Sequence, residues 1–410
     1  MTESTTSPKL IIATITVAAL GYFVDVYDLL VFSVVRVSSL KDLGVPDDAL
    51  LEQGLFLLNV QMVGMLLGGI CWGISGDRKG RLSVLLGSIF LYSIANIANG
   101  FVHSLEAYAL WRFISGFGLA GELGAGITLV TECMSKESRG YGTTIVATIG
   151  VAGAVAAAII GRMYSWRTCF FIGGGLGLAL LILRISVHES QLFRQLEANE
   201  GNVRRGDLRQ LLAPRERLFR YINCILVGLP IWYIVGILVT LCPEFGVAFG
   251  LSEPLSSGTA ILYSYGGFVI GDFLSGAVSQ IIKSRRKALY IFIIAMFTSV
   301  VAYLYLPHKS AGEVYWVLAV LGVASGYWAV FITTAAEQFG TNLRATVATT
   351  VPNFIRGSVV PISSLFVALK SPLGIIGSAA TVGAVCTIIA LFSLWHLKET
   401  YGTDLDYIEH

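Results

Sequence analysis

Long apolar stretches alternate with short polar ones along the whole chain. A helix needs about 20 mostly apolar residues to cross the hydrocarbon core of a bilayer. Lipid offers no partner to backbone polar groups, so a stretch of that length must be helical. The pattern therefore predicts an all-α membrane protein with twelve transmembrane helices. The expected helices cover about 10–37, 53–75, 82–101, 106–133, 140–161, 166–187, 218–242, 257–281, 287–306, 312–339, 345–369 and 373–396.

The polar segments between these stretches indicate how the chain is oriented. Lys and Arg are concentrated in alternate loops, such as 78–81 and 283–287, which share a side with both termini. Cytoplasmic loops carry an excess of Lys and Arg, so we expect both termini in the cytoplasm and the protein in a bacterial inner membrane. The first stretch has no small-residue cleavage pattern at its end, so we expect a retained helix and not a signal peptide.

In the middle of the chain a polar segment runs on for much longer than the other loops. This segment, 188–217, is rich in Arg and Glu, and we expect it to be a cytoplasmic linker that can lie along the membrane interface. It would join an N-terminal six-helix bundle, 1–187, to a C-terminal six-helix bundle with a short cytoplasmic tail, 218–410.

The two expected bundles repeat a charged motif. Glu132 precedes Arg139 by seven residues at the end of the fourth expected helix, and Glu337 precedes Arg344 by seven at the end of the tenth. Repeats on either side of a linker are typical of transporters that rock two bundles about a site near the membrane midplane. We therefore expect pseudo-twofold symmetry between the bundles.

Composition excludes several classes of protein. The apolar residues A, V, I, L, M, F, W, Y and C make up 55% of the chain, and Asp, Glu, Lys and Arg only 13%, about half of their usual share in soluble domains. A net charge of +2 provides no basic surface for nucleic acid. The six cysteines show no CxxC pair, and we expect no metal site. Neither a GxxxxGKS/T loop nor an HExxH or GxSxG motif occurs, so we expect neither ATP-driven transport nor an enzyme.

Several motifs resemble those of one transporter family. The segment 73–81, GISGDRKGR, resembles the GxxxDRxGR signature between helices 2 and 3 of the major facilitator superfamily, and 112–122, RFISGFGLAGE, resembles its RxxxGxGxxG pattern in helix 4. The acid that ends the second segment and the acidic stretch 21–28, GYFVDVYD, are similar to the metabolite:proton and phosphate:proton symporter branches. The strings HES at 188–190 and KETYG at 398–402 resemble sugar-porter strings in which proline stands first.

The resemblance implies the fold of this superfamily, two six-helix bundles around a central cavity, and a latch in the loop after the second helix. Asp77 would dock at the N-terminus of the eleventh helix, where the helix dipole favours an anion, and would stabilise the state closed to the cytoplasm. The alternative is an ordinary basic loop with a tight glycine turn. In the second half Gln280 falls where the acid would be, so we expect a one-sided latch. The residues assigned to gating are Gly73, Asp77, Arg78, Gly80, Arg81, Glu132, Arg139, Glu337 and Arg344.

Four charged residues lie within the first and fourth expected helices. Asp25 and Asp28 are three residues apart and share a helix face, Glu122 lies near the centre of the fourth helix, and Arg112 lies nearer its outer end. The resemblance implies that both helices line the cavity. Because like charges repel in a low dielectric, we expect at least one acid to hold a proton near neutral pH. Asp28 or Glu122 would carry the transported proton, and Arg112 would pair with the ionised acid. The alternative is a static ion-pair network that pins the two helices together.

Arg356 is the lone charge within the eleventh expected helix. A guanidinium matches a carboxylate bidentately, and a charge buried in a membrane is costly and usually functional. We therefore expect Arg356 to anchor a substrate carboxylate. The alternatives are a pair with Asp272 or a side chain that reaches the interface. Further candidates for the substrate site are Tyr27, Gln61, Trp232, Tyr233, Trp328 and Asn353.

These observations predict a proton-coupled symporter that imports a small organic acid or zwitterionic metabolite by alternating access. Its partners would be that small molecule and the lipid bilayer, its coupling ion the proton, and its oligomeric state a monomer. A proton-antiporting exporter uses the same kinds of residue and stays an alternative. A membrane receptor without transport activity is the alternative from another class.

Overall fold

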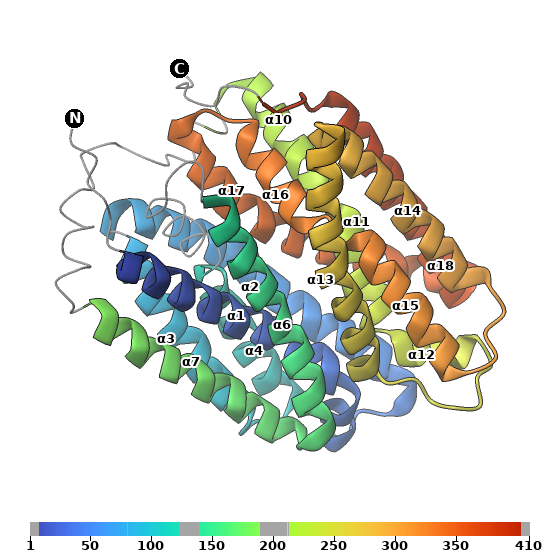
Figure 1. Ribbon diagram of the computed structural model, residues 1–410. Coiled ribbons are helices and arrows are strands. Elements are labelled where there is room, and N and C mark those ends of the chain that lie inside the picture. Colours follow the sequence, from blue (N-terminus) through green and yellow to red (C-terminus); the bar gives the residue numbers. More distant parts are fainter. Residues whose placement is uncertain (1–7, 80, 123–138, 189–210, 212, 403–410) are drawn as a thin grey trace, which may run out of the picture.

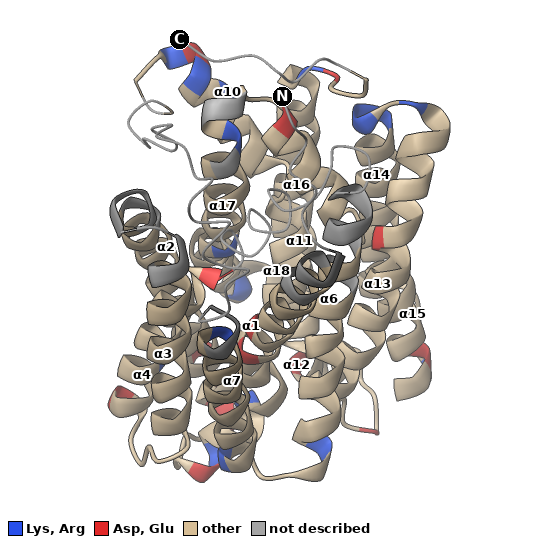
Figure 2. Ribbon diagram, turned by 60° about the vertical axis from the view of Figure 1, so that its left-hand side comes forward, with Lys and Arg blue, Asp and Glu red and all other residues tan. Residues whose placement is uncertain are grey.

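The computed structural model describes residues 8–79, 81–122, 139–188, 211 and 213–402. Within these residues all regular secondary structure is helical, and the helices pack side by side into one body (Figure 1). We call the described residues up to 188 the first half and those from 211 onward the second half. Most charged residues gather at the two ends of the helices, and few lie midway along them (Figure 2).

The described part of the first half consists of helices that pack side by side. Within it α1 packs against α6, α2 against α4, and α3 against both α4 and α7. Close approach depends on small residues: a Cβ on Gly153 of α6 would come within 2.1 Å of the Phe23 carbonyl oxygen of α1. The elements are α1 (Pro8–Asp42), the 3-10 turn η1 (Asp47–Ala49), α2 (Leu50–Lys79), α3 (Arg81–Asn99), α4 (Leu105–Leu119), α6 (Arg139–Met163) and α7 (Trp166–His188).

Helices of the second half are interrupted more often. Breaks fall between α10 and α11, between α15 and α16, and between α17 and α18, and η2 is a π-helical segment. Within this half α13 packs against α15, and α14 packs against α15 and α18. The elements are α10 (Arg215–Leu226), α11 (Leu229–Tyr233), η2 (Ile234–Val239), α12 (Cys242–Ala248), α13 (Ser257–Ile282), α14 (Arg285–Tyr305), α15 (Ala311–Ser325), α16 (Trp328–Glu337), α17 (Thr341–Gly357) and α18 (Val359–His396).

Eight helical spans in the described part of the chain are long and apolar enough to cross a membrane, against the twelve expected. The eleventh and twelfth expected helices form one continuous span, 346–396, with a bend at Gly374, where φ is +67°. The third and fifth appear as the shorter apolar helices 84–99 and 149–163. The fourth runs into residues outside the described ranges. The number differs because the last two expected helices count as one span, and because the third, fourth and fifth include positions outside the described residues and side chains.

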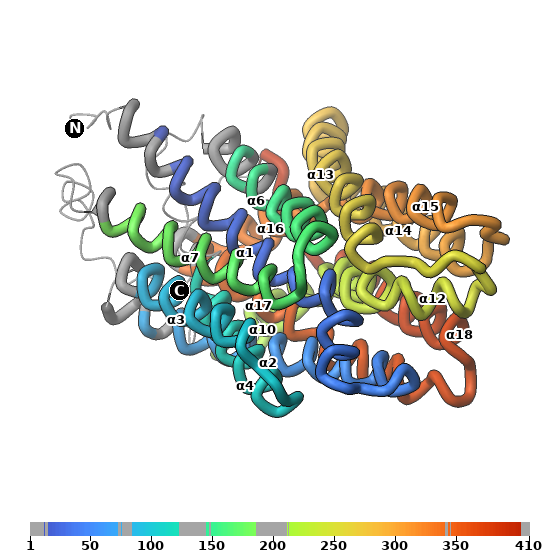
Figure 3. Tube along the Cα trace, turned by 90° about the horizontal axis from the view of Figure 1, so that it is seen from below, coloured from blue at the N-terminus to red at the C-terminus, as the bar shows by residue number. Residues whose placement is uncertain are grey.

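The two halves meet along several helices. In the first half α6 and α1 contact α13, and α2 contacts α17 and α18. Figure 3 shows the helices of the first half on one side and those of the second half on the other, with α6 beside α13. Where α1 ends, Asp42 pairs with Arg167 at the start of α7. We call this end of the molecule the Arg36 end, after the buried Arg36 near the end of α1.

Candidate functional site

A buried ion pair joins the two halves near the middle of the helices. Arg356 Nη2 of α17 lies 3.4 Å from Asp25 Oδ2 of α1, and both side chains are buried. The pair joins residues 331 positions apart in the chain. Arg356 therefore pairs with Asp25 and not with Asp272. Asp272 instead accepts a hydrogen bond from the backbone N–H of Ala329 (2.8 Å) at the start of α16.

Several polar atoms around this pair have no hydrogen-bond partner among the described residues. They include Arg356 Nε and Nη1, Asp25 Oδ1, and Trp232 Nε1. The Trp232 ring lies 6.0 Å from the Arg356 guanidinium carbon. Asn353, one turn before Arg356, donates to the Ala120 carbonyl oxygen (3.0 Å) and so links α17 to the end of α4. The unused guanidinium donors suit a carboxylate, which guanidinium groups bind bidentately.

An aromatic pair and a helix break lie close to the ion pair. Tyr22 lies beside Trp328 and near Arg356. Trp328 begins α16, just after the break at Gly326. A Cβ on Gly326 would come within 2.5 Å of the Asp272 backbone nitrogen, so this position needs a glycine. Trp232, Trp328 and Asn353 are thus the predicted substrate-site residues that lie around Arg356.

Asp28 points away from Arg356 and into the first half. Its carboxylate lies beside Asn96 of α3 and interacts electrostatically with Arg112 of α4, and a Cβ on Gly173 of α7 would come within 2.2 Å of its Oδ1. Positions three apart on a helix differ in direction by about 60°. This is enough for Asp25 to reach the second half while Asp28 faces the interior of the first.

Arg112 hydrogen-bonds an amide, and its expected pairing with an ionised acid stays a prediction. Its Nη2 donates to Gln61 Oε1 of α2. Its guanidinium carbon lies 4.8 Å from the centre of the Phe32 ring and 5.7 Å from that of Phe170. Nε and Nη1 have no partner among the described residues. Arg112 therefore retains two free donors beside Asp28.

Glu122 is bound by an arginine that we did not assign to the site. Arg184 of α7 donates to both of its carboxylate oxygens, and both side chains are almost fully buried. Arg184 lies within the apolar stretch 166–187. A cation inside an apolar stretch was the signal that could have identified it. The bidentate pair ties Glu122 to α7, and a proton-carrying role for Glu122 stays a prediction.

Two predicted substrate-site tyrosines use their hydroxyl groups within their own half. Tyr27 donates to the Cys169 carbonyl oxygen of α7 (2.9 Å). Tyr233 donates to the Ala379 carbonyl oxygen of α18 (2.6 Å). Both contacts hold neighbouring helices together, as does Gln61 through Arg112.

The expected gating residues of the first half are outside what the structure describes in side-chain detail. Gly80 and Glu132 lie outside the described ranges, and the described side chains do not include those of Gly73, Asp77, Arg78, Arg81 and Arg139. In the second half Glu337 Oε2 lies 3.5 Å from Arg285 Nε and accepts a hydrogen bond from Thr400 (2.7 Å). Arg344 donates to the Phe339 carbonyl oxygen (3.4 Å).

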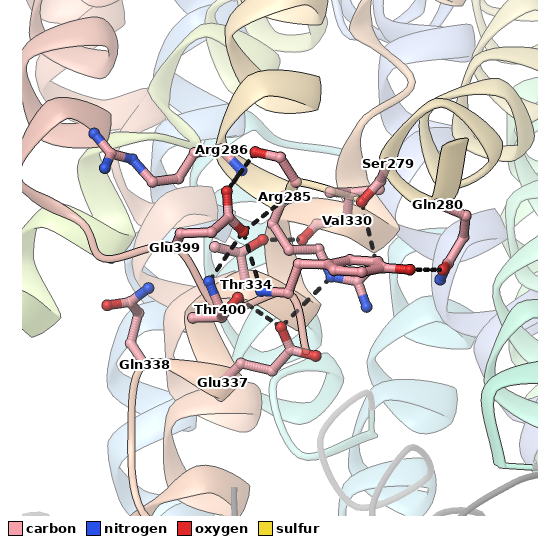
Figure 4. A network of polar contacts seen from close by, with 12 residues as sticks. Ser279, Gln280, Arg285, Arg286, Val330, Thr334, Glu337, Gln338, Glu399 and Thr400 are labelled. Atoms are coloured by element: carbon pink, nitrogen blue, oxygen red, sulfur yellow. Dashed lines mark hydrogen bonds and ion pairs between the residues drawn. The ribbon is translucent and has the colours of Figure 1, made fainter. Parts of the chain in front are cut away.

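A polar network surrounds Glu337 at the end opposite the Arg36 end (Figure 4). Its centre is Glu399, which accepts hydrogen bonds from Ser284 Oγ and from the backbone N–H groups of Arg285 (2.9 Å) and Arg286 (3.3 Å). Burial alone would raise the pKa of Glu399, but these hydrogen bonds outweigh it and lower the pKa. The acids of this network are Glu337 at the end of α16 and Glu399 just beyond the end of α18. Position 280, where the motif would place an acid, is a glutamine.

Comparison with known proteins identifies relatives of the chain. A family model described as Major Facilitator Superfamily matches residues 18–359. The chain is 31% identical over 179 residues to a sialic acid transporter of Escherichia coli, a match of 42% of this chain and 43% of that relative, so it spans less than half of that protein's length. It is 23% identical over 402 residues to a gentisate transporter of Corynebacterium glutamicum, covering 92% of this chain and 86% of the other.

A solved structure has the same fold. The crystal structure of a D-xylose-proton symporter matches with a TM-score of 0.72 at 17% sequence identity. The match covers 96% of this chain and 100% of the other. At this identity the likeness establishes the arrangement of the helices and not the cargo.

Proposed function

The chain belongs to the major facilitator superfamily, and we propose that within it the protein is a proton-coupled symporter that imports a small organic acid or zwitterionic metabolite. In this proposal twelve transmembrane helices form two six-helix bundles, 1–187 and 218–410, joined by the linker 188–217. Both termini face the cytoplasm of a bacterial cell. The bundles alternate access to a site between them.

The observation that carries the proposal is the Asp25–Arg356 pair between the halves. An ionised Asp25 occupies one nitrogen of the guanidinium. When Asp25 takes up a proton, its attraction for Arg356 falls and Arg356 can bind a substrate carboxylate instead. Proton binding and substrate binding therefore favour each other at one site.

The cost of burying charge explains why the two events are coupled. A buried guanidinium without a counter-ion is strongly unfavourable, so the halves rearrange readily only when an anion faces Arg356. That anion is Asp25 in the empty carrier and the substrate in the loaded, protonated carrier. A carrier with a protonated Asp25 and no substrate, or with substrate and an ionised Asp25, is unbalanced and rearranges slowly. This rule converts a proton gradient into substrate accumulation.

Two further observations support an organic acid as the cargo. The name of the Corynebacterium glutamicum relative states that it transports gentisate, which is an aromatic carboxylate. In this chain the Trp232 ring lies 6.0 Å from the Arg356 guanidinium carbon, so an anion bound there would have an aromatic surface beside it. We therefore favour an acid that carries an aromatic ring.

Uptake into proteoliposomes tests the proposal. With an acidic outside, wild-type protein should accumulate labelled gentisate or another aromatic acid and acidify the interior. Arg356→Gln should reduce uptake roughly 30- to 150-fold, the equivalent of about 2–3 kcal/mol for a lost charge-assisted contact. Lys370→Gln removes a half-exposed cation of the same half and should leave uptake unchanged. Proton efflux during substrate entry would identify an antiporter, and binding without flux for every acid would contradict transport.

A further inference from the structure

One face of α3 carries polar side chains inside an otherwise apolar bundle. Tyr92, Ser93, Asn96 and Asn99 are all fully buried. The Tyr92 hydroxyl, Ser93 Oγ and both polar atoms of the Asn99 side chain have no hydrogen-bond partner among the described residues, and Asn96 lies beside the Asp28 carboxylate without a hydrogen bond of good geometry. Buried polar groups in proteins are almost always paired, either with protein or with ordered water. A cluster of this size on one helix calls for a specific explanation.

Three other helices of the first half surround this face. From α1 comes the Asp28 carboxylate, which lies beside Asn96, and from α4 comes Arg112, whose Nε and Nη1 have no hydrogen-bond partner in the described part of the chain. Ser115 of α4 lies within 3.5 Å of Asn96 Oδ1 and can donate to it. The cluster is therefore continuous from α1 through α3 to α4, and it contains both donors and acceptors.

The fourth side is α7, which presents glycines to the cluster. A Cβ on Gly173 would come within 2.2 Å of Asp28 Oδ1, and a Cβ on Gly177 within 2.1 Å of Ser93 Oγ. The two glycines are one helical turn apart and so lie on the same face. The backbone of α7 thus packs directly against the polar atoms and gives them no side-chain partner.

The polar face leads along α3 towards the Arg36 end. Asn99 is the last residue of α3, and the following loop reaches the start of α7, where Arg167 binds both the Val102 carbonyl oxygen and Asp42. Asn99 lies about 4.5 Å further along the helix axis than Asn96. One bridging water molecule spans such a separation. Tyr92 continues the series one turn in the opposite direction.

We propose that these residues form a hydrated polar chamber within the first half, through which protons from the Arg36 end reach Asp28 and, from there, Asp25. The inference rests on the proposed function and adds an entry route to it. A separate route is needed because Arg36 and Glu244 bind each other between the halves at this end. Protons can then load the acids of α1 from the outside while the substrate path on that side is closed.

The charges around the chamber favour protons over a bound metal cation. The titratable or charged groups that face Asp28 are Asp25, Arg112, Tyr92 and Tyr27. The fixed positive charge of Arg112 repels a cation coordinated at Asp28. It also favours the ionised form of Asp28, but a proton that binds the carboxylate forms a covalent O–H bond, which a metal cation does not. Amide and hydroxyl groups on α3 can both accept and donate, as a hydrogen-bonded relay requires.

The test replaces Asn96 and separates net proton-driven uptake from exchange. Asn96→Leu keeps the branch at Cγ but removes the polar atoms, and Asn96→Ser keeps a polar group and leaves room for water. Substrate counterflow at equal pH moves cargo without net proton transfer, so it reports on folding and on the substrate site. Ser393→Ala, which changes another buried unpartnered hydroxyl in α18, is the matched control.

We expect Asn96→Leu to lower pH-driven uptake about tenfold or more, with counterflow within about twofold of wild type, and Asn96→Ser to restore most of the uptake. Unchanged uptake in Asn96→Leu, or equal losses of uptake and counterflow, would overturn the chamber while wild-type proton coupling stood. Sodium-driven uptake that Asn96→Leu abolishes would overturn it in favour of a cation site. Failure of the proposed function would be visible already in the wild type.

Discussion

Arg36 of α1 and Glu244 of α12 bind each other across the two halves, with Nη2 2.6 Å from Oε1. The Arg36 side chain is fully buried, and that of Glu244 is 19% exposed. Arg36 also donates to the Leu50 carbonyl oxygen at the start of α2 (3.1 Å) and to that of Thr240 (3.3 Å). One guanidinium thus holds three elements together at the Arg36 end. Together with Asn59, which accepts from Ser363 (2.8 Å), it keeps the halves in contact there.

Breaking this pair should open the Arg36 end. Removing one partner of a buried ion pair costs about 3–5 kcal/mol, because the other charge is left uncompensated. We expect Arg36→Met and Glu244→Met each to lower the melting temperature of the purified protein and to expose cysteines introduced near Thr240 to impermeant thiol reagents. The double variant should be more stable than either single one. Lys370→Gln, which breaks the exposed pair with Glu52 (3.8 Å), should cost at most about 1 kcal/mol. Equal stability of all four variants would contradict a closing role for Arg36.

Asp25→Asn should separate exchange from proton-driven accumulation. The amide is neutral at every pH, so Arg356 is permanently released and the substrate can bind without a proton. We expect counterflow to persist and uptake to lose its dependence on a pH gradient. Asp48→Asn, at an exposed position in η1, is the control. Normal accumulation in Asp25→Asn would place the coupling acid elsewhere, and Asp28→Asn would be the next variant to measure.

The Glu122–Arg184 pair should act on stability. Arg184→Met leaves a buried carboxylate without its two hydrogen-bonded partners, and we expect a loss of about 3–5 kcal/mol in the free energy of unfolding. The double variant with Glu122→Met should recover much of that loss, since it removes both charges. Thermal unfolding in detergent measures the three variants, and additive losses would show that the two side chains do not interact.

The Glu399 network should lose its contribution to stability in acid. The pKa of Glu399 is lowered in the folded protein, so its stabilising effect is complete above its unfolded pKa of about 4.3 and is lost as the pH falls through the lower folded pKa. The difference in melting temperature between wild type and Glu399→Gln should therefore be constant from about pH 6 to 8 and should shrink below about pH 4. Glu253→Gln, at an exposed position outside the network, is the control. If the difference in melting temperature grew as the pH fell, the prediction would be wrong.

Two glycines on α7 provide a matched test of the surroundings of Asp28. A Cβ on Gly173 would displace the Asp28 carboxylate, whereas a Cβ on Gly175 meets nothing within 4 Å. We expect Gly173→Ala to reduce pH-driven uptake about tenfold or more. Gly175→Ala should transport normally and gain up to about 1 kcal/mol of helix propensity. Similar transport by both variants would mean that Asp28 tolerates displacement.

The sequence predicted the family, and it identified the charged residues within apolar stretches but not their partners. A charge in an apolar stretch can be recognised from the sequence alone, and this pattern pointed to Asp25, Asp28 and Arg356 as candidate site residues. The partner of Arg356 depends on how α1 and α17 are rotated and where they cross, which no local pattern encodes. Arg184 was overlooked because it lies at the edge of its stretch, where basic residues ordinarily belong to the loop.

The same limit applies to the second half. Its network draws on Glu399, which follows the end of α18 and is far in sequence from position 280 in α13, so the motif around position 280 does not reveal it. The fold itself was predictable because each helix satisfies its own backbone in lipid. The interruptions in α15–α16 and α17–α18 depend on packing against other helices, as at Gly326 beside α13.

The opposition of Asp25 and Arg356 has an electrical consequence. If one negative group always faces the arginine, the site carries the same charge whether it moves empty or loaded with cargo and a proton. A charge that crosses the membrane gains about 2.3 kcal/mol per 100 mV, but a balanced site gains nothing from the membrane voltage. Such a carrier concentrates its acid from the pH difference alone, so it continues to work in a cell whose membrane has depolarised.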